Sequence, residues 1–320
     1  MTLDSLRTLG YLRPLRSAAT ITLGVALVLT GCSSSHSKSS SSGASTAPPC
    51  PTAPVNVAVS VDQWGDIVAT LGGNCAKVTT VLVSSSVDPH DYEPAPADAE
   101  LFSHAQLVVV NGAGYDVWAS KLAATTVPNA PVVSAGEVTK TPDGANPHLW
   151  YNPSAVTIFA EAVTAALTKL SPSAANYFRG QRSAFSADLK PYTDLVAKIK
   201  AEASGKTYAA TESVFDYMAA ALGLVNKTPE GYQRAVANET DPSPADIEAF
   251  GAALAHGQVN VLIYNTQTQG AVPEKIRAAA KEAGVPTVNV TETVAPGAVS
   301  FQSWQVDQLD RLAKALGVPA

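Results

Sequence analysis

Residues 55–83, which read VNVAVSVDQWGDIVATLGGNCAKVTTVLV, decide the class of fold. Valine-rich runs at 55–60 and 78–83 open and close this stretch, as is typical of β-strands. Between them, apolar residues recur at helical spacing from Trp64 to Leu71 before a Gly-Gly pair ends the pattern. Buried strands that alternate with a helix predict a parallel sheet covered by helices on both faces.

The same alternation continues on both sides of a long helical stretch. Further strands are predicted at 107–111, 131–134, 207–211, 259–264 and 287–290, and further helices at 213–222, 244–256, 272–283 and 301–316. Between the two sets, a helix of some thirty residues begins after Ser171-Pro172 and runs to Gly205, with Pro191 expected to kink or split it. We therefore predict an α/β fold of two lobes with central, mostly parallel sheets, joined by one long rigid α-helix.

This pattern divides the chain into five parts. They are a lipoprotein signal peptide (1–31), a flexible Ser-rich tether (32–54), an N-terminal α/β lobe (55–170), a linking helix (171–204) and a C-terminal α/β lobe (205–320). The chain of 320 residues is long enough for two cores. Its net charge of −6, without a basic stripe, argues against a nucleic-acid partner.

The first segment has the features of a secretory signal. Three arginines precede an uncharged apolar run at 18–30, which is too short to span a bilayer comfortably. The run ends in Leu-Thr-Gly-Cys, and small residues followed by Cys resemble a bacterial lipobox, so Cys32 is the predicted site of lipidation. The alternative is an uncleaved anchor with an incidental cysteine. Residues 33–49 are nearly all Ser, Gly, Ala, Thr and Pro, as in a flexible tether.

Cys50 and Cys75 remain as an even pair once Cys32 is assigned to lipid. Outside the cytoplasm a disulfide persists, and the two cysteines flank one strand–helix unit. We expect them to be bonded to each other. Two free buried thiols are the alternative.

Four loops that follow predicted strands contain potential metal ligands. Ligands of parallel sheets bind beyond the carboxyl ends of the strands. His90 lies in DPHDYEP at 88–94, His148 lies in NPHLWYNP at 146–153, and Glu212 and Glu292 each follow a strand closely. Two imidazoles and two carboxylates suit a borderline divalent cation such as zinc. The sequence thus predicts a metal site in the cleft between the lobes.

Each of these residues has a plainer interpretation. A loop histidine is usually solvent-exposed, and a Glu at a helix start usually complements the helix dipole. His90 and His148 nevertheless share a context, because each follows a proline and precedes an aromatic residue by two positions. His104 and His256 lie in predicted helices, where we expect surface or packing roles, and His36 lies in the tether.

From Val55 onward the chain resembles the zinc- and manganese-binding solute-binding proteins of bacterial ABC importers. The segments that carry the resemblance are DPHDYEPAPAD at 88–98, the strand and helix at 107–122, the loop at 146–153 and the segment at 211–224. The resemblance implies two α/β lobes bridged by one helix, with His90, His148, Glu212 and Glu292 as ligands. Zinc-specific members commonly have His where Glu212 stands, manganese members often have Glu there, and the fourth ligand is commonly Asp, so Glu292 is the least secure. Asn146 and Asn152 replace frequent Asp residues, which is expected to remove negative charge and a hydrogen-bond partner of His148.

The function expected from this resemblance is that of a non-enzymatic receptor. It would capture a divalent metal ion and deliver it to the membrane permease of an ABC importer, as a monomer lipid-anchored to the outer face of the cell membrane. Zn²⁺ is favoured because of the imidazoles and the general affinity order, and Mn²⁺ or iron is the alternative. A tethered metallohydrolase is less consistent with four protein ligands, because a catalytic zinc keeps a position open for water. A surface adhesin remains a further alternative.

Overall fold

The computed structural model describes residues 48–83, 92–268, 270–295 and 297–319. The first sheet has the strand order β2-β1-β3-β4, and all its neighbouring strands are parallel. Its strands are β1 (Val55–Val61), β2 (Ala76–Leu82), β3 (Leu107–Val110) and β4 (Val132–Ser134). The valine-rich runs therefore form a parallel sheet, as predicted, in which β1 and β3 are buried and the edge strand β2 is mostly half-buried.

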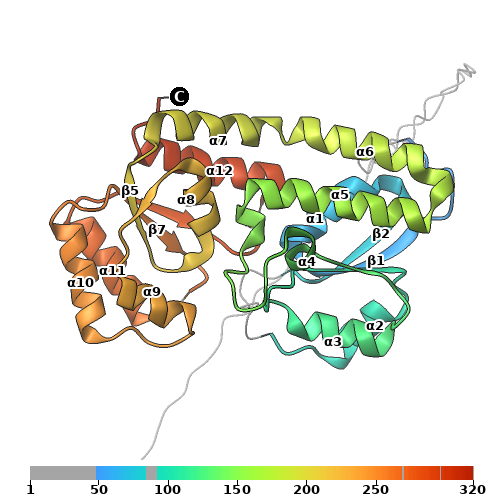
Figure 1. The fold of residues 1–320 in the computed structure, drawn as a ribbon, viewed down its shortest axis with the longest axis horizontal. Coiled ribbons are helices and arrows are strands. Elements are labelled where there is room, and N and C mark those ends of the chain that lie inside the picture. Colours follow the sequence, from blue (N-terminus) through green and yellow to red (C-terminus); the bar gives the residue numbers. More distant parts are fainter. Residues whose placement is uncertain (1–47, 84–91, 269, 296, 320) are drawn as a thin grey trace, which may run out of the picture. The chain divides into compact units, whose positions relative to one another are not determined.

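Helices cover both faces of this sheet (Figure 1). They are α1 (Asp62–Gly72), α2 (Pro96–Ser103), α3 (Val117–Thr126), α4 (Ala135–Thr139) and α5 (Pro153–Leu170). Alternate residues of β1 point to opposite faces, because Val57 and Val59 join the core that contains Trp64, whereas Ala58 joins a separate cluster with Phe102 of α2. These elements form the N-terminal lobe.

The second sheet repeats the arrangement with the strand order β6-β5-β7-β8, again fully parallel. Its strands are β5 (Thr207–Ala210), β6 (Val225–Asn226), β7 (Val261–Asn265) and β8 (Thr287–Val290). Its helices are α8 (Asp216–Leu222), α9 (Glu230–Ala237), α10 (Pro244–Ala255), α11 (Ala271–Glu282) and α12 (Phe301–Ala315). These elements form the C-terminal lobe, so the predicted two-lobed α/β fold is confirmed.

The connection between the lobes consists of two consecutive helices, α6 (Ala175–Asp188) and α7 (Lys190–Ala203). The break falls at Leu189, and Pro191 occupies the first turn of α7, where a missing backbone N–H leaves no bond unmade. Of the two outcomes that Pro191 predicts, a kink or a split, the structure has the split.

The lobes share packing as well as this connection. Helix α7 runs beside α12 (Figure 1), and the rings of Tyr192 and Phe301 lie 6.4 Å apart between them. One apolar cluster contains core residues of both sheets, such as Val57 and Val261. Between α1 and α12, Asp66 accepts a hydrogen bond of 2.6 Å from the backbone N–H of Phe301.

The start of the first lobe is tied to its first helix. Cys50 and Cys75 form a disulfide, with their Cα atoms 5.0 Å apart, so residue 50 is joined to the turn that follows α1. Cys32, the predicted lipidation site, lies outside the described residues. Within the parts of the chain that the structure describes, no helix is both long and apolar enough to cross a membrane.

Candidate metal centre

Three of the four predicted ligands meet where the two lobes face each other. One donor atom from each of His148, Glu212 and Glu292 lies within 4.8 Å of the others. Glu212 lies two residues after β5 and Glu292 lies two residues after β8, so the same edge of one sheet supplies both carboxylates. His148 comes from the opposite lobe, between α4 and α5. His90, the remaining predicted ligand, lies in 84–91, outside the described residues.

The side chain of Asn146 holds the ring of His148. Its Oδ1 accepts the backbone N–H of His148 at 3.0 Å and lies 2.7 Å from the ring Nδ1. A backbone N–H can only donate, so this amide oxygen faces the histidine and Nδ1 carries the proton. Nε2 is then the nitrogen with a lone pair for a cation. The expectation that Asn146 removes a partner of His148 is wrong, because the amide oxygen takes that role itself.

Aromatic rings enclose the same imidazole. The ring of Trp150 lies 5.3 Å from that of His148, and the ring of Tyr115 lies 6.1 Å away, both edge-on. The side chain of His148 is 2% exposed. Asn111 supports the loop by donating to the carbonyl oxygen of Pro147 at 3.0 Å. Packing and hydrogen bonds therefore fix the position of this nitrogen donor before a cation arrives.

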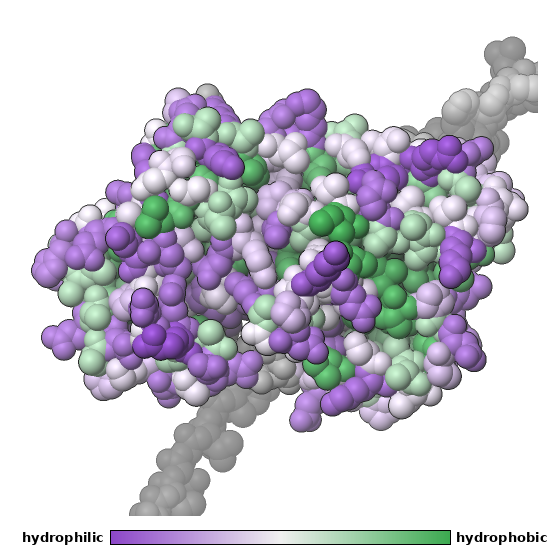
Figure 2. Space-filling view, in the orientation of Figure 1, coloured by the Kyte–Doolittle hydropathy of each residue, from purple (hydrophilic) through white to green (hydrophobic). Residues whose placement is uncertain are grey.

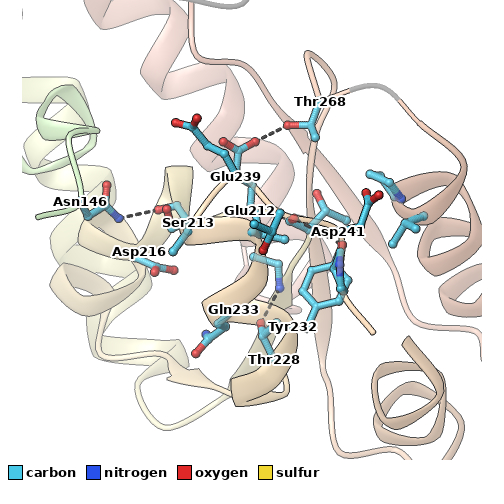
Figure 3. A pocket seen from close by; sticks show the side chains of 18 of the residues that line it. Asn146, Glu212, Ser213, Asp216, Thr228, Tyr232, Gln233, Glu239, Asp241 and Thr268 are labelled. Atoms are coloured by element: carbon cyan, nitrogen blue, oxygen red, sulfur yellow. Dashed lines mark hydrogen bonds between the residues drawn. The ribbon is translucent and has the colours of Figure 1, made fainter. Parts of the chain in front are cut away.

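Polar groups of the C-terminal lobe hold the two carboxylates. Asn265 donates from Nδ2 to Glu212 Oε2 at 2.6 Å and to Glu292 Oε1 at 2.8 Å. The hydroxyl of Thr268 also donates to Glu212 Oε2 (Figure 3). On the side of Glu292 that faces the other lobe, Oε2 accepts from the Tyr115 hydroxyl at 3.2 Å and lies 3.7 Å from His148 Nε2.

The loop that carries Glu292 is fixed through Gln267. Its Oε1 accepts the backbone N–H groups of Glu292 and Thr293, at 2.6 and 2.9 Å. Glu292 is only 2% exposed. The sequence marks Glu292 as the least secure of the four ligands, yet the structure places it deeper than Glu212.

Burial makes the ionised carboxylates costly. The pKa of Glu212 is raised, first by burial and then by the negative charge of Glu292, while His148 acts in the opposite direction. Burial, followed by the charge of Glu292, also raises the pKa of Tyr115. A divalent cation held among these groups would favour both carboxylates in their charged form.

A cavity of about 890 Å³ opens beside these groups and is lined by both lobes. Asn146 and His148 line it from the N-terminal lobe, and Glu212, Asp216 and Asp241 line it from the C-terminal lobe. Figure 3 shows Asn146 reaching across to the carbonyl oxygen of Ser213, a hydrogen bond of 2.8 Å. In Figure 2, hydrophilic residues predominate on the visible face of the C-terminal lobe.

Sequence reasoning did not find the supporting residues Tyr115, Asn265, Gln267 and Thr268. Three of them lie in Asn-Thr-Gln-Thr at 265–268, a polar run at the carboxyl end of β7. That position is itself a signal, because strand ends of parallel sheets form ligand sites. The two histidines that we expected to have surface or packing roles lie elsewhere. His104 and His256 are exposed residues that directly follow α2 and α10.

One imidazole and two carboxylates, contributed by both lobes, match the donor preferences of divalent transition metals. The fold and this site define a class, the two-lobed binding proteins that hold a small solute between their lobes. A family model described as the periplasmic zinc-uptake complex component A, ZnuA, matches residues 57–315. The chain belongs to this family, which consists of solute-binding receptors rather than enzymes.

Relatives in the family differ in the metal that their names give. The chain is 26% identical over 209 residues to the manganese-binding lipoprotein MntA of Halalkalibacterium halodurans, covering 62% of this chain and 65% of the relative. It is 30% identical over 172 residues to the iron-binding protein YfeA of Yersinia pestis, covering 50% and 54%. It is 24% identical over 284 residues to the manganese ABC transporter substrate-binding lipoprotein PsaA of Streptococcus pneumoniae, covering 78% and 85%. The first two matches thus span less than two thirds of those relatives.

Solved structures show the same fold. The crystal structure of ZnuA superposes with a TM-score of 0.68 at 19% sequence identity, covering 82% of this chain and 99% of that one. Similarity at this level of identity establishes the two-lobed architecture. The fold does not determine which metal ion is bound.

Proposed function

We propose that the protein captures a divalent transition-metal ion, with zinc favoured, and delivers it to the permease of an ABC importer. The observation that carries this proposal is the convergence of His148, Glu212 and Glu292 within 4.8 Å, with donors from both lobes. A cation bound there links the lobes, since each supplies part of its coordination shell. The names of relatives such as PsaA support an ABC transporter as the partner.

We assign the remaining coordination position to His90, in the sequence Asp88-Pro89-His90. It shares with His148 a preceding proline and a following aromatic residue, and the family resemblance assigns it the first ligand. With His90 the donor set is two nitrogens and two carboxylates, which satisfies tetrahedral zinc. Mn²⁺ or iron is the alternative cargo, supported by the names of MntA and YfeA.

The proposal includes the location of the protein. Lipidation at Cys32 would anchor a monomeric receptor to the outer face of the cell membrane, where it meets both free metal and the permease. The lipobox-like end of the signal and the lipoprotein names of relatives support this location.

Metal analysis of the purified protein tests the proposed cargo. After removal of metal with a chelator, calorimetric titration with zinc and with manganese should give one site per chain. Zinc should bind more tightly, because imidazole nitrogens suit zinc better. Binding of neither ion would refute the proposal, and tighter binding of manganese would assign the alternative cargo.

The location has its own test. Mass spectrometry of the mature protein should find a lipid-modified N-terminus at Cys32, and Cys32→Ala should release the protein from membranes or block its maturation. An unmodified mature N-terminus at another residue would contradict the anchor without affecting the metal site.

A further inference from the structure

Asn265 is a buried polar residue between the two carboxylates of the candidate site. It is the last residue of β7 and is 1% exposed. β7 lies between β5 and β8 in the sheet, and these are the strands that lead into Glu212 and Glu292. The strand order alone therefore places position 265 between the two carboxylate-bearing loops.

The orientation of the Asn265 amide follows from its other contact. Its Oδ1 accepts the backbone N–H of Gln267 at 3.1 Å, and because that group can only donate, Nδ2 must point the other way. Nδ2 carries two hydrogens, and two carboxylate oxygens lie at 2.6 and 2.8 Å from it. Thr268 Oγ1 is also 2.9 Å from Nδ2, but charged oxygens are the stronger acceptors, and the Thr268 hydroxyl itself donates to Glu212.

These hydrogen bonds engage one oxygen of each carboxylate. Glu212 Oε2 accepts from both Asn265 and Thr268, which matches the two acceptor positions of one carboxylate oxygen. Glu292 Oε1 accepts from Asn265, whereas Oε2 is the oxygen that lies 3.7 Å from His148 Nε2. Asn265 and Thr268 therefore hold Glu212 by Oε2, and Asn265 holds Glu292 by Oε1, while Oε2 of Glu292 lies beside His148 and accepts from the Tyr115 hydroxyl.

We propose that Asn265 is a specificity-determining positioning residue that limits Glu212 and Glu292 to one metal-binding oxygen each. This inference rests on the proposed function and adds the physical basis of its selectivity. With His148 and the ligand His90 of the proposed function, two single oxygens make a four-coordinate shell, which zinc accepts. Manganese takes six ligands in octahedral, oxygen-rich sites, and two bidentate carboxylates would supply the two extra oxygens. A neutral amide that holds both carboxylates therefore favours zinc without adding or removing charge.

The decisive measurement is the ratio of the Kd for manganese to the Kd for zinc. In Asn265→Ala each carboxylate loses its hydrogen bond to the amide, although Thr268 still donates to Glu212 and Tyr115 to Glu292, and each is freer to bind through two oxygens. We expect the ratio to fall by about tenfold, the order of magnitude of one lost hydrogen bond to a charged group. X-ray absorption of the zinc-loaded and manganese-loaded variant should show more oxygen neighbours around the metal, a change that general loosening of the fold would not produce.

Two further variants separate positioning from folding. Asn265→Asp keeps the acceptor for Gln267 and the shape of the side chain but removes both N–H donors, and it should lower the ratio in the same direction. Because both ions are divalent, the added charge acts on their affinities alike and leaves the ratio to report donor geometry. Thr268→Val releases only Glu212 and should give a smaller fall.

Asn260→Ala is the matched control. Asn260 is another asparagine of the same lobe, but its Oδ1 accepts the backbone N–H of Thr207 at 2.8 Å, at the start of β5 and far along the strand from the site. The ratio of the manganese Kd to the zinc Kd in Asn260→Ala should equal that of the unmodified protein.

The outcomes are distinguishable. A ratio that stays unchanged in Asn265→Ala, with zinc still bound, overturns the role of Asn265 and leaves the proposed function standing. Should Asn265→Ala fail to fold, an unchanged ratio in Asn265→Asp overturns it equally. If the unmodified protein binds neither ion, the proposed function fails, and the role of Asn265 fails with it.

Discussion

The two lobes hold their parts of the site by different means. On the N-terminal side, aromatic rings and one amide oxygen enclose His148. On the C-terminal side, hydrogen-bond donors surround Glu212 and Glu292. A neutral imidazole can be buried among rings at little cost, whereas a carboxylate needs donors when it leaves water. We infer that the N-terminal lobe contributes a rigid nitrogen donor, and that the C-terminal lobe contributes oxygens whose arrangement decides selectivity.

Removing the rigid donor should have the largest effect. His148→Ala should weaken zinc binding by on the order of 100-fold or more, because water replaces a preorganised nitrogen ligand poorly. Calorimetry with zinc measures this change. His256→Ala is the control, because His256 is an exposed residue at the end of α10. The zinc affinity of this variant should equal that of the unmodified protein. An unaltered affinity in His148→Ala would mean that the metal binds elsewhere.

Removing the support of that donor should have the next largest effect. Asn146→Ala frees the Nδ1–H of His148 and breaks the bond to Ser213, so zinc affinity should fall by about 10–100-fold, as is usual for partners of ligating histidines. Asn152→Ala is the control from the same loop. Asn152 caps α5 through the backbone N–H of Ser154, so its loss should lower stability by ~1 kcal/mol and spare zinc affinity.

Asn146→Asp separates the two contacts of Asn146, the one with the His148 ring and the one with Ser213. A carboxylate accepts the Nδ1–H of His148 more strongly, so this variant should retain zinc affinity or increase it. A loss equal to that of Asn146→Ala would show that the donation to Ser213, and not the orientation of the ring, is what matters.

The folding stability contributed by contacts between the lobes should depend on pH. Asp62 of α1 accepts the backbone N–H of Val294 at 3.3 Å, and burial raises the pKa of Asp62 to about 7. A raised folded-state pKa means that the folded protein binds this proton more tightly than the unfolded chain, so stability is lost as pH rises from about 4 to about 7. Asp62→Asn mimics the protonated form and should stabilise the protein by about 1–2 kcal/mol at pH 8, after allowance for partial exposure.

Thermal unfolding of Asp62→Asn and the unmodified protein at pH 8 and pH 4 checks this prediction. The difference in stability should shrink at pH 4, where both side chains are uncharged. Equal stability at both pH values would contradict it. Asp66 lies one turn further along α1, and burial raises its pKa in the same direction, so it adds to the pH dependence of both proteins alike.

The smallest effect is expected from relieving the charge of the carboxylate pair. Glu212→Gln removes a buried charge whose pKa is raised by burial and by Glu292, while the amide oxygen can still accept from Asn265 and Thr268. The metal-free protein should gain about 1 kcal/mol, or roughly 2–4 °C in Tm, at neutral pH. Melting curves with and without zinc should show that the stabilisation by zinc is reduced in this variant. A lower Tm without metal would show that the hydrogen bonds outweigh the charge repulsion.

Local patterns in the chain were sufficient for most of the fold. Valine-rich runs that alternate with helices predict parallel strands, because helices that connect such strands cover both faces of the sheet. Pro191 predicts the break between α6 and α7, because it cannot donate a backbone hydrogen bond. Strand β6, by contrast, has two residues and no periodicity to detect, and its pairing with β5 depends on the neighbouring strand.

The candidate site divides in the same way. Proline-flanked histidines and glutamates at strand ends are visible in the sequence, because the carboxyl ends of parallel strands form one edge. That edge also contains Asn265, but no local pattern shows which carboxylates its amide joins. Only the order of β5, β7 and β8 in the sheet brings Glu212 and Glu292 to either side of it. Likewise, Asn146 and His148 are two residues apart in the sequence, but the contact of Asn146 with Ser213 requires the two lobes to meet.

By itself, the sequence therefore determined the class of fold, the loops that carry the ligands and the types of donor, because these depend on hydrophobic periodicity and side-chain chemistry along a short stretch. Only the tertiary structure decided how the donors are held: the amide oxygen on His148 Nδ1, the shared Asn265 amide and the depth of Glu292. These contacts join residues up to 177 positions apart, as in the bond from Tyr115 to Glu292. Their hydrogen bonds depend on distances of a few tenths of an ångström, which packing of the two lobes sets and no local pattern encodes.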